Sequence, residues 1–165
     1  MALKGDRYLA ITEIGFFMDQ VAERGGVAVM KTAGSGAALN QQAAEVEYVA
    51  DPSGKYPVGL LLDDMVDKDL TRTHLNFQKS EHQKGSKVGL LRDGWVVTNL
   101  LYSATGVLHV PVAGAKAYLG PSGTLTAYQG GDLENPAVGR WESTLDEDNY
   151  AKVYIKLPSD AHYNA

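Results

Sequence analysis

The feature of the sequence that most restricts the fold is the density of turn-forming residues. In the second half of the chain, turn signals recur at intervals of about 8 to 12 residues, a spacing typical of a β-sandwich or β-barrel. They fall at Asp93-Gly94, Gly106, Gly114, Gly120-Pro121-Ser122-Gly123, Gly130-Gly131 and Asn135-Pro136. The 165 residues include 18 glycines and contain no linker, repeat or low-complexity tract at which the chain would divide. The sequence therefore predicts one mainly β domain over residues 1–165, a small β-barrel or β-sandwich with long loops and at most a short helix.

Alternation of apolar and polar residues locates several strands. The clearest case is the segment 150–157, in which apolar residues predict a buried side and the residues between them a wet side. The buried side carries Ala151, Val153, Ile155 and Leu157, and the wet side carries Tyr150, Lys152, Tyr154 and Lys156. The segments 45–50 and 70–79 alternate in the same way, and the first ends at a predicted turn over residues 51–54. Between residues 85 and 102, the dipeptide Asp93-Gly94 predicts a hairpin turn joining two strands.

The segment 8–30 allows two interpretations. Arg24-Gly25-Gly26 predicts a turn between two strands, because glycine permits positive φ. A short helix over residues 14–22 is the alternative, since apolar residues recur there at helical spacing. Those residues are Ile14, Phe17, Met18 and Val21.

Four aspartates follow directly after an apolar run at residues 57–62. We expect Val58, Leu60 and Leu62 to lie in the core. The acids are Asp63, Asp64, Asp67 and Asp69. Carboxylates could supply oxygen ligands to Ca²⁺ or Mg²⁺, but the spacing is not that of an EF-hand loop. We therefore interpret the cluster as a strand that ends in a solvated acidic turn, and we interpret the second acidic run, residues 145–150, in the same way.

Composition and motifs argue against several classes of function. A formal net charge of −5, with Lys and Arg scattered along the chain, predicts no direct contact with nucleic acid. The chain has no cysteine, its four histidines are far apart, and it contains no nucleophile-elbow or phosphate-loop motif. No segment resembles a signal peptide or a membrane span. The sequence predicts a protein made in a reducing cytosol, without enzymatic activity, metal, cofactor or membrane contact.

Several stretches resemble the decoration, or cement, proteins on the capsid surface of tailed bacteriophages. These are SGKYPVGLLLDDMVD, GSKVGLLRDGWVVTN and NPAVGRWESTLDEDNYAKVYIKLP, with FFMDQVAERGGVAVM near the start. Together they cover about half of the chain. The chain is longer than the smallest decoration proteins.

The resemblance implies a β-barrel or β-tulip-like fold and a virion structural protein on the outer capsid surface. Its partner would be the major capsid protein, whose shell it would stabilise, and it would associate with itself as a homotrimer. Residues 1–8 would form an extended N-terminal arm that clamps onto the shell, and the acidic rim after residue 62 would meet neighbouring subunits. The contact residues expected on this basis are Lys4, Asp6, Arg7, Asp63, Asp64 and Asp67.

Two other functions stay open. A tail, baseplate or fibre module of a phage would share the same β-rich composition. A small β-barrel hydrolase or carbohydrate-binding domain would use Trp95, Trp141 and the two acidic runs.

Overall fold

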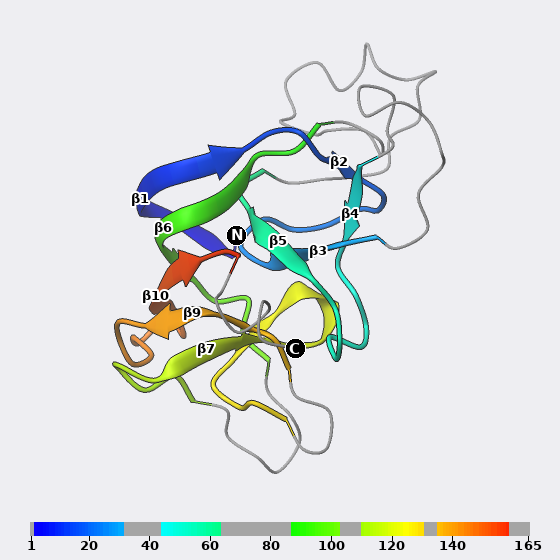
Figure 1. The fold of residues 1–165 in the computed structure, drawn as a ribbon. Coiled ribbons are helices and arrows are strands. Elements are labelled where there is room, and N and C mark those ends of the chain that lie inside the picture. The colour runs from blue at the N-terminus through cyan, green and yellow to red at the C-terminus, as the bar shows by residue number, and fades with distance from the viewer. Residues whose placement is uncertain (1, 32–43, 64–86, 103–109, 131–134, 159–165) are drawn as a thin grey trace.

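A computed structural model describes residues 2–31, 44–63, 87–102, 110–130 and 135–158. In these residues the chain forms ten β-strands and one short 3-10 helix, η2, and no α-helix (Figure 1). The elements are β1 (Leu3–Glu13), β2 (Phe17–Met18), β3 (Val27–Met30), β4 (Glu45–Glu47), β5 (Pro57–Leu61), β6 (Leu90–Thr98), β7 (Lys116–Leu119), η2 (Pro121–Gly123), β8 (Leu125–Thr126), β9 (Ala137–Trp141) and β10 (Ala151–Lys156). The prediction of a mainly β domain with little helix is confirmed.

The ten strands belong to one sheet that is open, so the predicted closed barrel is wrong. The strand order is β2-β4-β3-β5-β6-β10-β9-β7-β8, with β1 paired to β6. Among the described residues, β2 and β8 end this order and do not pair with each other. β6 changes its pairing partner along its length. Residues 90–91 of β6 pair with β5, and residues 93–98 pair with β10. The sheet therefore divides into two wings, which lie on different sides of β6 in Figure 1.

Two clusters of buried side chains fill the interior. The first draws on both wings and contains Trp141 together with residues of β3, β5, β6 and β10. The second lies at β2, β4 and the start of β6, and includes Met18, Val46, Leu61 and Leu90. Burial of this kind stabilises a fold by roughly 1.5–3 kcal/mol for each large apolar side chain. The residues of the predicted final strand that were expected in the core, 151, 153, 155 and 157, are all buried.

The run at residues 57–62 is a buried strand, as predicted, but it does not bury a single face. Val58, Leu60 and Leu62 are all buried. Leu60 and Leu62 belong to the first cluster, whereas Val58 belongs to the second. The register between β3 and β5 explains this difference. Ala28 is opposite Gly59 and Val29 is opposite Pro57, so Val58 is an extra residue in a bulge. A bulge interrupts the alternation of faces, so Val58 lies in a different cluster from Leu60 and Leu62.

The predicted hairpin at Asp93-Gly94 is wrong, because β6 continues through it. Gly94 lies opposite Leu9 of β1 and opposite Ile155 of β10. Its φ is 146°, and a Cβ at this position would overlap the carbonyl oxygen of Tyr8. Glycine is therefore required for the close approach of β1 within the sheet rather than for a turn.

The strand-turn-strand interpretation of residues 8–30 is confirmed, and the helical alternative is wrong. Phe17 and Met18 are both buried in β2, whereas Ile14 and Val21 are exposed. The apolar residues therefore do not form one buried stripe, which a helix would need. Gly25 has a φ of 102° at the predicted turn, and its N–H donates to the carbonyl of Leu61 at 2.8 Å.

Two other predicted segments have different outcomes. The segment 45–50 contains β4 and ends at a turn in which the Ser53 N–H donates to Asp51 Oδ1 at 3.1 Å, as the sequence predicts. The predicted strand over residues 70–79 lies outside the described residues.

The role of Gly94 predicts a large loss of stability on Gly94→Ala. The added methyl group would clash with the backbone of β1 and disfavour the positive φ, so we expect a loss of about 2–4 kcal/mol in the free energy of unfolding. Urea denaturation measures this quantity. Gly5→Ala, in the same pair of strands, is the matched control, because a Cβ at Gly5 would meet nothing within 4 Å. Equal unfolding midpoints for Gly94→Ala and the unmodified protein would contradict this account of the fold.

Candidate functional site

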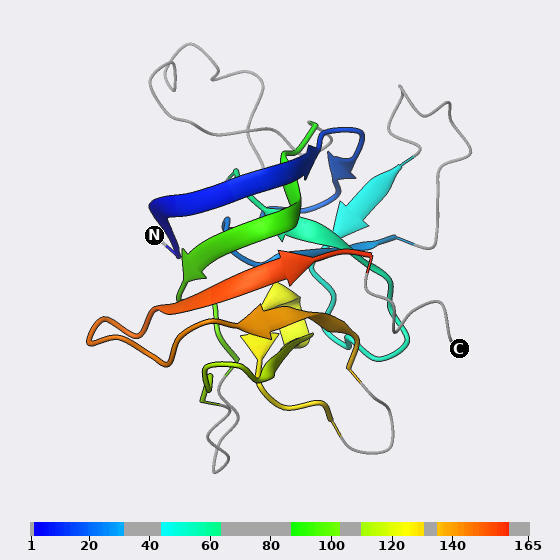
Figure 2. The ribbon, with the colours of Figure 1, turned by 60° about the vertical axis from the view of Figure 1, so that its left-hand side comes forward.

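The register of the sheet aligns five side chains in a row across five strands. Each member is directly opposite the next, in the order Tyr8, Trp95, Tyr154, Arg140 and Lys116. Directly opposed residues of neighbouring strands project from the same face of a sheet. Val153 and Ile155, between the outward residues of β10, are buried in the first cluster, so the row points away from the core. We call this side of β1, β6, β10, β9 and β7 the outer face. Figure 2 shows the ribbons of β1, β6, β10 and β9 side by side.

The aromatic half of the row is held by polar contacts. The Lys152 ammonium lies 3.9 Å from the centroid of the Trp95 ring and 3.1 Å from Glu142 Oε2. The Tyr154 hydroxyl donates to Asp93 Oδ1 at 2.5 Å. This hydrogen bond to a carboxylate raises the pKa of Tyr154, because it stabilises the protonated phenol.

Aromatic and aliphatic surface continues from this half of the row onto β1. Tyr8 and Ile11 are each 55% exposed. Both residues lie on the outer face, since Tyr8 is opposite Trp95 and Ile11 is opposite Asp93. This end of the outer face therefore presents uncovered apolar side chains beside half-buried ones.

The basic half of the outer face consists of exposed cations on three adjacent strands. Lys116, Arg140 and Lys156 are exposed. In the described part of the chain, no carboxylate forms an ion pair with any of them. The two carboxylates beside them, Asp93 and Glu142, already bind Tyr154 and Lys152. Cations that are scattered along the sequence are therefore gathered on one face of an acidic protein.

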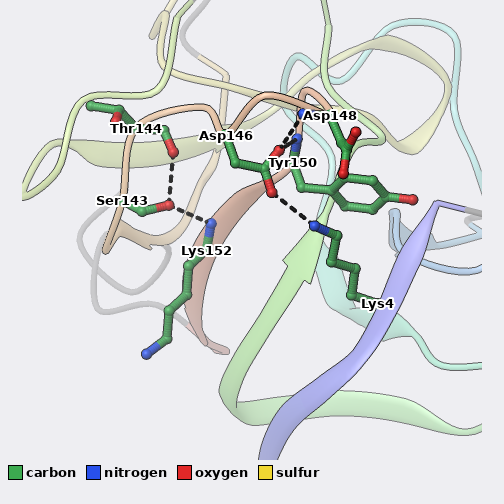
Figure 3. A network of polar contacts seen from close by, with 7 residues as sticks. All are labelled: Lys4, Ser143, Thr144, Asp146, Asp148, Tyr150 and Lys152. Atoms are coloured by element: carbon green, nitrogen blue, oxygen red, sulfur yellow. Dashed lines mark hydrogen bonds and ion pairs between the residues drawn. The ribbon is translucent and has the colours of Figure 1, made fainter.

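Lys4, one of the predicted contact residues, takes part in an intramolecular network (Figure 3). Its ammonium lies 2.8 Å from Asp146 Oδ2 and 4.2 Å from the centroid of the Tyr150 ring. Asp146 Oδ1 also accepts the N–H groups of Asp148 at 3.0 Å and Tyr150 at 2.7 Å. The acidic run at residues 145–150 is thus a charged turn, as predicted, and it is tied to the start of β1. The hydrogen bond from Lys4 lowers the pKa of Asp146, and the same bond raises the pKa of Lys4.

The predicted N-terminal arm is part of the sheet. Residues 3–8 lie in β1, Ala2 and Leu3 are buried, and the Ala2 N–H donates to Glu23 Oε1 at 2.8 Å. Asp6 and Arg7 are exposed. The isolated chain therefore already orders this segment on its own sheet, and the exposed part of β1 remains available to a partner.

The acidic rim lies away from the predicted contacts in β1. Asp63 is exposed directly after β5, while Asp64 and Asp67 lie outside the described residues. β5 ends beside Leu90, at one end of β6, whereas Leu3 pairs with Thr98 at the other end. Eight residues of strand separate these ends by ~25 Å. Asp63 and Lys4 therefore do not belong to one contact patch.

A hollow of about 540 Å³ lies near the start of β4 and is lined by ionisable side chains of both signs, Glu13, Lys31, Glu45 and Arg92. Lys31, in its lining, donates to Asp19 at 2.6 Å and to Glu45 at 3.1 Å. These two hydrogen bonds raise the pKa of Lys31. A charged, paired lysine is a poor nucleophile or base, so Lys31 is not placed for either role.

Three further features of the described residues concern metal binding, membrane spanning and sugar stacking. No group of three or more His, Asp or Glu side chains among these residues is placed to hold a metal ion. No helix in the described ranges is long and apolar enough to cross a membrane. Trp141 is fully buried in the first cluster, so its ring cannot serve as a stacking platform for a sugar.

Comparison with known proteins gives no further guide. The chain matches no protein-family model, and a search of curated proteins also found no match.

Most of the outer face was missed by reasoning from the sequence. The alternation of Lys152, Tyr154 and Lys156 was visible, and it correctly indicated the wet side of a strand. Arg140 and Lys116 join that side only through the pairing of β10 with β9 and of β9 with β7. Pairing partners far apart in sequence leave no local signal by which this neighbourhood could be found.

The bond between Tyr154 and Asp93 predicts a tyrosine that ionises at unusually high pH. A raised folded-state pKa means that the contribution to stability is present below pH 10 and is lost as the pH rises through the folded value. Ultraviolet difference titration of the unmodified protein and of Tyr154→Phe isolates this group among nine tyrosines. The difference curve should have its midpoint above pH 10, and a midpoint at or below 10 would be inconsistent with the bond.

The network at Lys4 predicts an acid-sensitive contribution to stability. Asp146 has a pKa below its ordinary value of 3.8, so the contribution is present above that value and is lost as the pH falls through the folded pKa. Lys4→Met should lower the melting temperature at pH 7, because it removes the charged partner. The deficit should shrink as the pH falls below 3.8 and through the lowered folded-state pKa of Asp146, and a deficit independent of pH would show that the ion pair does not contribute. Lys55→Met, a lysine that forms none of the ion pairs among the described residues, is the control.

Proposed function

We propose that the protein is a non-enzymatic virion structural protein that binds the outer surface of a phage capsid through its outer face. In this role it stabilises the shell formed by the major capsid protein. The observation that carries the proposal is the row of aromatic and basic side chains across five strands, in which Tyr8, Arg140 and Lys116 are exposed. The resemblance of several stretches to capsid decoration proteins supplies the identity of the partner.

The composition of the outer face suits a protein partner. Tyrosine, tryptophan and arginine are the residues most enriched at the energetic centres of protein interfaces. Tyr8, Trp95 and Arg140 supply one of each within a single row. Tyr8 and Ile11 offer apolar area that is uncovered in the isolated chain. The row spans five adjacent strands, and a surface of this breadth suits contact with another protein.

Because a capsid shell repeats the same subunit, weak contacts made by each copy of the protein can add up to firm attachment. Linked copies that bind neighbouring shell subunits raise the effective concentration of one another, so weak individual contacts sum to firm attachment. Association of the protein as a homotrimer is part of the proposal for this reason. Light scattering coupled to size-exclusion chromatography measures the mass of the particle. A monomeric mass at all concentrations would contradict the homotrimer.

The proposal predicts binding to purified, expanded capsids of the phage that encodes the protein. Co-sedimentation with capsids should deplete the protein from the supernatant, and parallel samples with purified tails should not. Binding to tails alone would favour the tail, baseplate or fibre alternative, and binding to neither would refute a virion role.

Substitutions in the outer face test, in the same sedimentation assay, whether this face makes the contact. Tyr8→Ala and Arg140→Ala should each weaken capsid binding about tenfold or more, since a residue at the energetic centre of an interface contributes about 2 kcal/mol or more and about 1.4 kcal/mol is a factor of ten. Tyr56→Ala is the matched control, because Tyr56 is 60% exposed and is not in the row. If Tyr56→Ala weakened binding as much as Tyr8→Ala, the outer face would not be the contact surface.

A further inference from the structure

We propose that Lys116 and Arg140 form a carboxylate-binding pair that takes an acidic segment of the partner protein. The identity of that partner as the shell protein rests on the proposed function. The affinity for carboxylates is a property of the pair itself and can be measured on the isolated protein.

The first observation is that two like charges face each other across neighbouring strands. Lys116 of β7 is directly opposite Arg140 of β9. Directly opposed residues of antiparallel strands have Cβ atoms about 4.5–5.5 Å apart, and like charges in such pairs destabilise a sheet. Both side chains are exposed, and no carboxylate among the described residues pairs with either. The isolated chain therefore carries a repulsion that a bound anion would relieve.

The two cations carry the donor groups that bind a carboxylate. The guanidinium of Arg140 can donate two parallel hydrogen bonds to one carboxylate, and the ammonium of Lys116 adds a compact positive charge. Lys156 on β10 extends the positive surface by one strand. Beyond Arg140 the row continues into Tyr154 and Trp95, which are only partly buried. The site therefore fits a segment that carries carboxylates and runs on into apolar or aromatic residues.

Net charge favours an acidic protein segment over a nucleic acid. The chain as a whole has a formal charge of −5, which repels a long polyanion. The described cations Lys116 and Arg140 lie together at one end of the outer face, so a short acidic segment needs to contact only that end, whereas a long polyanion would extend past it.

The pair also predicts that stability and binding respond in opposite directions to one substitution. Lys116→Glu replaces a like-charged pair with an oppositely charged one, so the melting temperature should rise by about 1–4 °C. The same variant places a carboxylate where the ligand would bind, so binding should be lost. If Lys116 had a purely structural role, its substitution would not raise the melting temperature while abolishing binding.

The test uses fluorescein-labelled hexaglutamate and fluorescence anisotropy at low ionic strength. The unmodified protein should bind this peptide, and Lys116→Glu and Arg140→Glu should each weaken binding at least about tenfold. Lys116→Arg should retain binding. Lys55→Glu makes the same charge change in the turn before β5 and is the control for net charge.

Three results would overturn the inference. They are equal hexaglutamate binding by Lys116→Glu and Lys55→Glu, a lowered melting temperature for Lys116→Glu, and tighter binding of a labelled oligothymidylate of similar charge than of hexaglutamate. Capsid sedimentation is a separate readout. Hexaglutamate binding without capsid binding would refute the proposed function and leave the carboxylate pair standing, and the converse would refute the pair alone.

Discussion

The pairing of β6 with three other strands is the constraint on which the rest of the structure depends. One edge of β6 carries β1, while the other edge carries β5 at residues 90–91 and β10 at residues 93–98. Gly94 permits this arrangement, because any side chain there would overlap the backbone of β1. The change of partner along one edge divides the sheet into two wings, and the first buried cluster draws on both. Among the described residues, β2 and β8 end the strand order, and each meets a segment that flanks β6 at a single bridge, Phe17 with Lys87 and Leu125 with Leu101.

The same pairing creates the outer face. Tyr8 and Trp95 meet because β1 and β6 are in register at that point, and Trp95 meets Tyr154 through β10. The register continues to Arg140 and Lys116, so a row that starts with aromatic rings ends with cations. Contacts such as the bond from Tyr154 to Asp93 and the position of Lys152 over Trp95 fix the middle of the row. A partner would therefore meet a surface whose central side chains are already ordered, which reduces the entropy lost on binding.

Local patterns in the sequence predicted the features that depend on neighbours along the chain. The strand β10, the buried strand β5 and the charged turn at Asp146 follow from alternation, apolar runs and turn chemistry within a few residues. Features that depend on distant partners were not predictable. Asp93-Gly94 has the composition of a hairpin turn, yet the approach of Tyr8 from β1 decides the role of that glycine. Lys4 was expected to contact a partner, but its ammonium is bound by Asp146, 142 positions away. The bulge at Val58 likewise follows from the register with β3, which no local pattern reveals.

The orientation of the protein on a capsid is the most direct test of the claim that the outer face is its contact surface. Electron cryo-microscopy of expanded capsids decorated with the protein would show which side of the sheet lies against the shell. We expect β1, β6, β10, β9 and β7 to lie against the shell, with Tyr8, Arg140 and Lys116 at the boundary between the two densities. Density that placed the outer face toward solvent, or that placed the protein on the tail, would contradict it.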